Sequence, residues 1–434
     1  MCKECKLGEN FVLRVRSVLH GAGKYGILVT MKRFRRISLV AALCVCLSIL
    51  AMCMGGCQKK VWNGTDYAAY TSKQYVTTQY FATPIRVVIQ DDFTDPQAAI
   101  DADNVWQEIC DRLQRIHTAV DTAADIQNAD ADLARWNALD GVQTQELEVG
   151  QDTYRILEAA KEAYRLTDGA FNPCMARSAD LWGFSPRFYN DDAPQLVYPY
   201  DRTDPKTALP NDTYVQAFGA FADVFAQIEL TQWTDEQNVA HYSVTKPEGA
   251  YAVVDGVTYP AWMDLGGIAK GYAADVATSI LREHGYSFGY VSIGTSSISA
   301  LCSIDYNTLA PAQVDWTLGV RHPRSPQDTY VKIFVHDATV STSGDYERYY
   351  EIDGVRYCHI IDPRSGKPLQ GDRYSVTVIA DNAALADALS TAILIDGTQA
   401  NWMQKNRAWK YAAYGSQGLY TDLDASQYLH GTRK

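Results

Sequence analysis

Residues 263–276 constrain the fold most, because they place an aspartate, two adjacent glycines, a lysine and a third glycine where a helix begins. The stretch reads Met-Asp-Leu-Gly-Gly-Ile-Ala-Lys-Gly-Tyr-Ala-Ala-Asp-Val. Apolar residues recur at helical spacing over 268–280, and Gly285 supplies a stop. Adjacent glycines let backbone groups approach a ligand, and a cation such as Lys270 in the first turn favours a bound anion. We expect an anion site with a buried carboxylate at Asp264; an ordinary turn with a solvated lysine is the alternative.

The N-terminal region has the pattern of an export signal. A basic run at residues 32–36 precedes an apolar run at 37–54, and Gly-Gly-Cys57 follows directly. We interpret residues 31–57 as a lipoprotein signal peptide with Cys57 as the lipidated residue, residues 1–30 as an upstream extension, and residues 58–79 as a tether. A transmembrane anchor is the alternative, since a run of this length just spans a bilayer. Either interpretation predicts a body at the extracytoplasmic face of the cell membrane.

Charge and cysteine usage narrow the function further. Residues 1–57 carry nine Lys/Arg and two Asp/Glu, a charge of +7, so the rest of this chain of net charge −12 sums to −19. A body this acidic is a poor binder of nucleic acid, and we expect no nucleic-acid partner. Beyond Cys57 the cysteines are Cys110, Cys174, Cys302 and Cys358, whose spacing fits no zinc site. Whether they are free or paired stays open.

Helical and strand patterns mix along the chain without repeats or a low-complexity linker, which predicts an α+β protein with one catalytic unit over residues 80–434. The patterns predict helices at 95–120, 153–166, 214–227 and 383–395, strands at 84–90, 290–298, 331–335 and 374–380, strands with a turn at 255–256 within 241–262, and a hairpin at 346–361 turning at Asp353-Gly354.

The 383–395 helix carries a candidate metal site. Leucines and an isoleucine form an apolar stripe, while Asp387 and Thr391 lie one turn apart on the opposite face. A carboxylate and a hydroxyl are hard oxygen ligands that Mg²⁺ accepts. Solvated side chains on a polar helix face are the alternative.

Two further segments carry candidate chemistry. His359 stands at the end of the second hairpin strand, where it suits a general base or a structural histidine bonded to a carbonyl. Residues 341–345, Ser-Thr-Ser-Gly-Asp, surround Gly344 with small hydroxyls at Thr342 and Ser343. They suit a phosphate or ribose cradle, or an ordinary turn.

The order of four motifs closely resembles the ApbE family of FAD:protein FMN transferases. They are Asp-Leu-Gly-Gly-Ile-Ala-Lys-Gly-Tyr-Ala, Thr-Ser-Gly-Asp-Tyr-Glu-Arg, His-Ile-Ile-Asp-Pro-Arg-Ser-Gly and Ala-Asp-Ala-Leu-Ser-Thr-Ala. The resemblance runs over residues 83–397. The chain departs from it at Phe81-Ala82-Thr83, where the family often has Met-Gly-Thr, at Pro173-Cys174, where it often has Pro-Thr, and in the signature ending at Asn137.

This resemblance implies an ApbE-like fold and an enzyme that binds FAD and Mg²⁺, transfers FMN to a threonine of a target flavoprotein subunit and releases AMP. It implies metal ligation by Asp387, Thr391 and the carbonyl of Gly267, flavin-nucleotide contacts from Asp264 and Lys270, and a catalytic role for His359. The implied acceptors are subunits of Rnf-type or Na⁺-pumping NADH:quinone reductase complexes. An Mg²⁺-dependent FAD pyrophosphatase and a non-catalytic flavin-binding lipoprotein are the alternatives.

Overall fold

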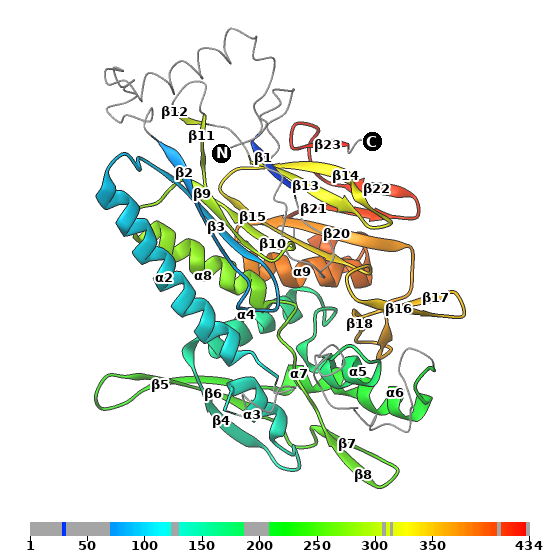
Figure 1. Ribbon diagram of the computed structural model, residues 1–434. Helices are drawn as coiled ribbons and strands as arrows, with labels where there is room; N and C mark the ends of the chain where they lie inside the picture. The colour runs from blue at the N-terminus through cyan, green and yellow to red at the C-terminus, as the bar shows by residue number, and fades with distance from the viewer. Residues whose placement is uncertain are drawn as a thin grey trace, which may run out of the picture.

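A computed structural model describes residues 28–31, 70–122, 130–185, 208–305, 310–312, 316–405 and 409–430. Its centre is an antiparallel sheet of eight strands in the order β2-β3-β9-β10-β15-β20-β21-β22 (Figure 1). The strands are β2 (Thr71–Thr77), β3 (Ile85–Asp91), β9 (Gly289–Ile293), β10 (Ser297–Ala300), β15 (Ala338–Gly344), β20 (Arg373–Ala380), β21 (Lys410–Gly415) and β22 (Gly418–Thr421).

Helices cover one face of this sheet and a second sheet covers the other (Figure 1). The helices are α2 (Pro96–Ala119), α8 (Ala269–Glu283) and α9 (Ala383–Asp396), with α4 (Gln151–Leu166) packed against α9 and α2. The second sheet has the order β1-β13-β14-β23, with β1 (Leu28–Met31), β13 (Trp316–His322), β14 (Ser325–Val335) and β23 (Tyr428–His430). Within β3, Val87 packs toward the helices and Val88 toward Trp316 of the second sheet. Because both of its faces are covered, β3 buries four successive residues, 87–90, without alternation.

Smaller elements extend the helical side (Figure 1). They are α3 (Asp132–Ala138), α5 (Ala176–Leu181), α6 (Asp212–Gly219), α7 (Val224–Gln227) and a three-stranded sheet of β4 (Gln145–Val149), β6 (Ala240–Lys246) and β5 (Leu230–Thr234). Two-stranded pairs are β7 (Tyr251–Val254) with β8 (Val257–Pro260), β11 (Ser303–Asp305) with β12 (Ala310–Ala312), β16 (Tyr349–Ile352) with β17 (Val355–Cys358), and β18 (Ile361–Asp362) with β19 (Lys367–Pro368). The short α10 (Asn401–Lys405) follows α9. Separate antiparallel sheets with packed helices confirm the predicted α+β class.

Three predicted elements differ from the structure. The tether predicted for residues 58–79 is wrong at its end, because β2 pairs with β3 at the edge of the central sheet. The strand predicted at 290–298 is a hairpin: β9 ends at Ile293, and Gly294 turns the chain at φ 67°. The helix predicted at 214–227 is broken into α6, a 3₁₀ turn and α7.

The predictions for the N-terminal region concern residues that the structure mostly leaves undescribed. Cys57 and the apolar run before it lie outside the described residues. Leu28–Met31 pairs with β13, a placement that the sequence did not predict; in a mature protein that begins at Cys57, β13 would instead form the edge of this sheet. Within the described residues no helix is long and apolar enough to cross a membrane. Cys110, Cys174, Cys302 and Cys358 are all free thiols, which answers the question left open above.

Candidate active site

The turn that enters α8 is built from its own side chains. The Asp264 carboxylate accepts a hydrogen bond from the Gly266 N–H at 2.7 Å, and the Lys270 ammonium donates to the Gly266 carbonyl at 2.6 Å. Asp264 is exposed, so the prediction of a buried carboxylate is wrong: its oxygen closes the turn at the surface. Gly267 follows, and an ideal Cβ there would lie 3.2 Å from the ring of Phe171. The turn therefore stays glycine-rich because a ring packs beneath it.

Two buried polar side chains hold the segment before Asp264. Asn137 of α3 clamps the backbone of Met263, donating to its carbonyl at 3.0 Å and accepting from its N–H at 2.7 Å. Lys246, fully buried at the end of β6, donates to the carbonyl of Ala261 at 2.8 Å and to the carbonyls of Trp136 and Leu139. Burial lowers the pKa of Lys246 to about 7, but three carbonyls match the three donors of its charged form. Sequence reasoning placed Asn137 in a family signature without a role and missed Lys246, which no local pattern marks.

Asp387 is the buried charge of the site. It lies on α9 with 3 % of its surface exposed, among residues that are buried on every side of that helix. Its carboxylate accepts hydrogen bonds from the Ser341 hydroxyl at 2.9 Å and the Gly271 N–H at 3.2 Å, and the Lys270 ammonium lies 3.9 Å away. Burial raises the pKa of Asp387, and the charge of Lys270 opposes that shift. The alternative of solvated side chains on a polar face of this helix is wrong for Asp387, because α9 packs against α4, α8 and the central sheet.

Strand β15 sends alternate side chains to opposite faces of the sheet, which divides the predicted 342–344 cradle. The Ser343 hydroxyl faces α9 and lies 2.9 Å from the Thr391 hydroxyl and 2.7 Å from that of Ser390. The Thr342 hydroxyl faces the other side, 2.9 Å from that of Thr377. Gly344 is buried, and an ideal Cβ there would lie 2.2 Å from the ring of Tyr346. Ser343 therefore joins the Asp387 side of the sheet, whereas the Thr342 side chain lies on the opposite face.

The turn before α8 and helix α9 carry oxygen donors of the types that Mg²⁺ accepts. Asp387 supplies a carboxylate, Thr391 a hydroxyl, and Gly267 a backbone carbonyl in the turn before α8. Among the described residues no group of three or more His, Cys, Asp or Glu side chains could hold a metal on its own. Mg²⁺ commonly binds through one or two carboxylates and takes its remaining ligands from phosphates and water. The donor set therefore suits an ion that arrives with a phosphate-bearing substrate.

His359 follows β17 and is held by the neighbouring strand. Its backbone N–H donates to the Arg348 carbonyl at 3.1 Å, and its ring Nδ1 lies 3.3 Å from the same oxygen. Because a carbonyl only accepts, we assign the ring proton to Nδ1, which leaves Nε2 as a free acceptor. Burial, with the charges of Arg348 and Lys270, holds the pKa of His359 well below 6.5. A neutral imidazole with an open Nε2 is the form that a general base requires.

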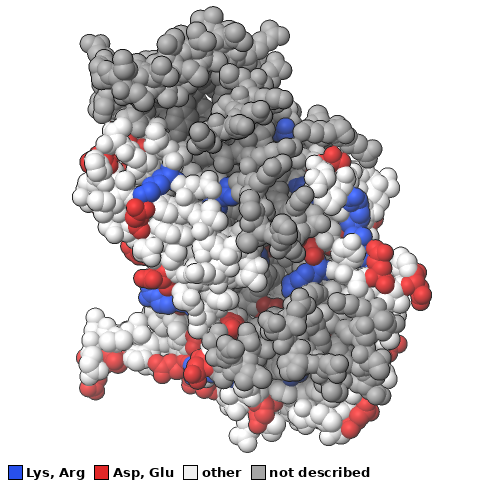
Figure 2. Space-filling model, viewed as in Figure 1, with Lys and Arg blue, Asp and Glu red and all other residues white. Residues whose placement is uncertain are grey.

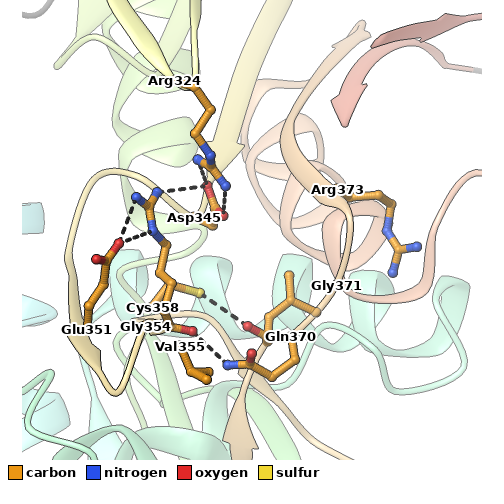
Figure 3. Close-up of a pocket in the computed structure, with 11 residues that line it drawn as sticks. Arg324, Asp345, Glu351, Gly354, Val355, Cys358, Gln370, Gly371 and Arg373 are labelled. Atoms are coloured by element: carbon orange, nitrogen blue, oxygen red, sulfur yellow. Dashed lines mark hydrogen bonds and ion pairs between the residues drawn. The ribbon is translucent and has the colours of Figure 1, made fainter. Parts of the chain in front are cut away.

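The hairpin that carries His359 is fixed on two sides. On one side Tyr357 stacks on Trp182 at 5.6 Å, and the Tyr350 hydroxyl donates to the Trp182 carbonyl. On the other side lies a polar cavity of about 410 Å³, where Arg324 makes a bidentate ion pair with Asp345 at 2.7 and 2.6 Å (Figure 3). The lining of this cavity includes none of the predicted site residues. We therefore assign the residues that line this cavity to the support of the hairpin.

The geometry brings most of the predicted site residues to one place. Lys270 lies between the turn and Asp387, and its charge also acts on His359; Ser343 joins Thr391. In the view of Figure 2 basic side chains form isolated patches, and acidic side chains are spread over the visible face. Sequence reasoning missed Ser341, which pairs with Asp387 but stood in the predicted motif only as a turn residue.

Comparisons with known proteins identify the family of this chain. Residues 81–414 match the ApbE family. The FAD:protein FMN transferase of Treponema pallidum is 30 % identical over 295 residues, 67 % of this chain and 72 % of that protein, and that of Vibrio cholerae is 26 % identical over 66 % and 73 %. The crystal structure of the ApbE protein from Thermotoga maritima superposes with a TM-score of 0.58 at 25 % identity, covering 82 % of this chain and 97 % of that one. The flavin transferase ApbE from Vibrio cholerae has the same fold, with a TM-score of 0.57 at 20 % identity over 82 % of this chain and 98 % of that one. The chain is a member of the ApbE family.

Proposed function

We propose that this chain is an Mg²⁺-dependent FAD:protein FMN transferase that attaches FMN to a threonine hydroxyl of an acceptor protein and releases AMP. The observation that carries the proposal is the buried carboxylate of Asp387, which lies 3.9 Å from the Lys270 ammonium in a family whose relatives bear that name. Burying a carboxylate is costly, and Lys270 offsets part of that cost. A metal bound with a pyrophosphate would supply a second cation.

The residues divide the chemistry between them. Asp387, Thr391 and the Gly267 carbonyl would hold Mg²⁺, which when bound neutralises pyrophosphate charge. Lys270 adds a second positive charge beside the same phosphates. Nε2 of His359 takes the proton of the incoming hydroxyl, whose oxygen forms a bond to the phosphorus of the FMN half. The bond between that phosphorus and the bridging oxygen breaks, and AMP leaves with the electron pair.

Mass measurement of the acceptor tests the reaction. The protein is incubated with FAD, Mg²⁺ and a flavin-carrying subunit of the Rnf or Nqr type, and the acceptor is weighed. We expect an acceptor heavier by one FMN and an equal amount of AMP. AMP and free FMN without modified acceptor would favour the FAD pyrophosphatase, and neither product would favour a flavin-binding lipoprotein.

Substitutions assign the roles. His359→Ala should retain FAD binding and lose roughly 10²–10⁴-fold in transfer, the usual contribution of a general base. Asp387→Ala should lose transfer at ordinary Mg²⁺, whereas Thr391→Val removes a neutral oxygen and should recover with excess Mg²⁺. Arg282→Gln is a matched control, because its pair with Asp337 is an exposed surface contact. Normal transfer by Asp387→Ala would rule out this metal site.

We also propose that the protein is anchored by a lipid on Cys57 at the extracytoplasmic face of the membrane. The support is the sequence pattern of residues 31–57. Mass spectrometry of the membrane-bound protein should find a lipid-modified Cys57 as the first residue. A mature chain that retains residues 31–56 would indicate a plain transmembrane anchor.

A further inference from the structure

The first turn of α9 is held by a carboxylate from another helix. Helices leave their first N–H groups without partners inside the helix. Asn382 satisfies one of them, since its side chain accepts from the Leu385 N–H at 2.7 Å. The N–H groups of Ala383 and Ala384 donate instead to the two oxygens of Asp275 in α8, at 2.8 and 2.9 Å. The half-buried carboxylate of Asp275 therefore caps the start of the helix that carries Asp387.

A second contact lies one turn earlier on the same face of α8. The Gly271 N–H donates to the Asp387 carboxylate at 3.2 Å, and an ideal Cβ on Gly271 would lie 2.1 Å from the Ala383 carbonyl oxygen. Gly271 and Asp275 lie four residues apart on α8, and Ala383 and Asp387 lie four residues apart on α9. Asp275 contacts Ala383 and Gly271 contacts Asp387. These two contacts fix the translation and the rotation of α9 relative to α8.

We propose that Asp275 is a positioning residue for the metal ligands of α9. It sets the position of the helix through Ala383 and Ala384, and so places Asp387 one turn later and Thr391 two turns later. Groups that orient metal ligands from behind typically change metal affinity 10–100-fold when removed. The inference rests on the proposed function, since it presumes that these ligands bind Mg²⁺.

Asp275→Asn is the informative change. The amide keeps the size of the carboxylate and one acceptor oxygen, but it turns an NH₂ group toward a backbone N–H. Asp95→Asn is the matched control: Asp95 caps α2 through the Gln97 N–H at 2.8 Å, far from α9 in sequence and exposed. Both variants replace a carboxylate at a helix N-terminus by an amide, so an effect seen only in Asp275→Asn is not a general effect of that exchange.

Mn²⁺ binding measured by electron paramagnetic resonance separates positioning from stability, because it reports the metal site of the folded protein without turnover. We expect Asp275→Asn to weaken Mn²⁺ binding about 10-fold or more, and Asp95→Asn to leave it unchanged. Excess Mg²⁺ should restore much of the FAD cleavage of Asp275→Asn.

The outcomes distinguish this inference from the proposed function. Wild-type affinity in a folded Asp275→Asn would overturn the inference and make Asp275 a helix cap alone. If Asp275→Asn does not fold, Asp275→Glu, which keeps the charge but shifts the oxygens, takes its place; unchanged affinity there would overturn the inference equally. A wild-type protein that binds no Mn²⁺ and cleaves no FAD would overturn the proposed function together with this inference.

Discussion

Replacing Gly271 with alanine tests the contact on which the active site depends. The new methyl group would lie 2.1 Å from the Ala383 carbonyl oxygen, 2.6 Å from its carbon and 2.7 Å from the Cα of Ala384. All three are backbone atoms of α9, so no side chain can rotate away. Reaching even 3.0 Å requires α8 and α9 to separate by about 0.9 Å at this point. Overpacking of this kind costs about 1–3 kcal/mol.

Two smaller terms adjust that cost. The hydrogen bond between the residue 271 N–H and Asp387 is already 3.2 Å long, and its loss adds about 1.5 kcal/mol because the acceptor is charged. The higher helix propensity of alanine returns about 1 kcal/mol. We therefore expect Gly271→Ala to lower the free energy of unfolding by about 1.5–3.5 kcal/mol. A displacement near 1 Å at the metal ligands should also reduce FAD cleavage about 10²-fold.

Urea denaturation measures the first effect, and AMP release as a function of Mg²⁺ concentration measures the second. Ser279→Ala is the control, because Ser279 lies on the exposed face of the same helix. An unchanged free energy of unfolding in Gly271→Ala would mean that α8 and α9 do not meet at Gly271. Lost stability with wild-type Mg²⁺ dependence would mean that this contact does not position Asp387.

Three further changes test individual parts of the structure. Because the pKa of His359 lies below 6.5, the imidazole is already neutral at higher pH. The acid limb of the pH profile of transfer should therefore lie at pH values below 6.5, and a limb above that value would exclude His359 as the base. Lys246→Met removes the ammonium from the carbonyls of Ala261 and Leu139 and leaves that of Trp136 with only the Leu139 N–H, so it should cost roughly 3 kcal/mol or more in urea denaturation; a smaller loss would mean that water replaces the ammonium. Hydrogen bonds to Glu148 and Asp235 raise the pKa of His241, so the protonated ring stabilises the fold below pH 6.5 and this stabilisation is lost as pH rises through the raised pKa. The difference in Tm between wild type and His241→Gln should therefore shrink as pH rises. A difference that stays constant with pH would contradict this.

The sequence predicted the elements whose signals are local. Helix α2 begins at a proline after a capping aspartate, and its apolar spacing runs almost its whole length. The β16–β17 hairpin turns at Asp353-Gly354, both with positive φ of 51° and 76°, as such turns require. In each case a few adjacent residues determine the geometry, so neighbours in the chain were sufficient.

Sequence-based expectations failed where residues distant in the sequence determine the environment of a side chain. The helix predicted at 383–395 has nearly the predicted limits, but the alternative of a solvated polar face is wrong for Asp387, because Ser341 and Gly271 supply its partners from β15 and α8. Asp264, expected to be buried, closes an exposed turn instead. Thr342 fell on the wrong face because its motif was interpreted as a turn, whereas it lies within β15 and follows strand alternation. Position and residue type were predictable from the chain; environment was not.

Burial of Asp387 changes what its substitution should do to stability. A polar residue facing solvent would be neutral when replaced, but a buried carboxylate beside one lysine carries a desolvation cost that metal binding offsets. Asp387→Asn keeps the size of the side chain and removes the charge, so the metal-free protein should be as stable as wild type or more stable. Added Mg²⁺ should then separate the two: at a concentration 100 times its Kd the wild type gains about 2.7 kcal/mol, and the variant gains almost nothing. Tm measured with and without Mg²⁺ gives both comparisons. Equal Mg²⁺ stabilisation of the two proteins would show that the ion binds elsewhere, and a metal-free variant far less stable than wild type would show that the charge of Asp387 serves the fold.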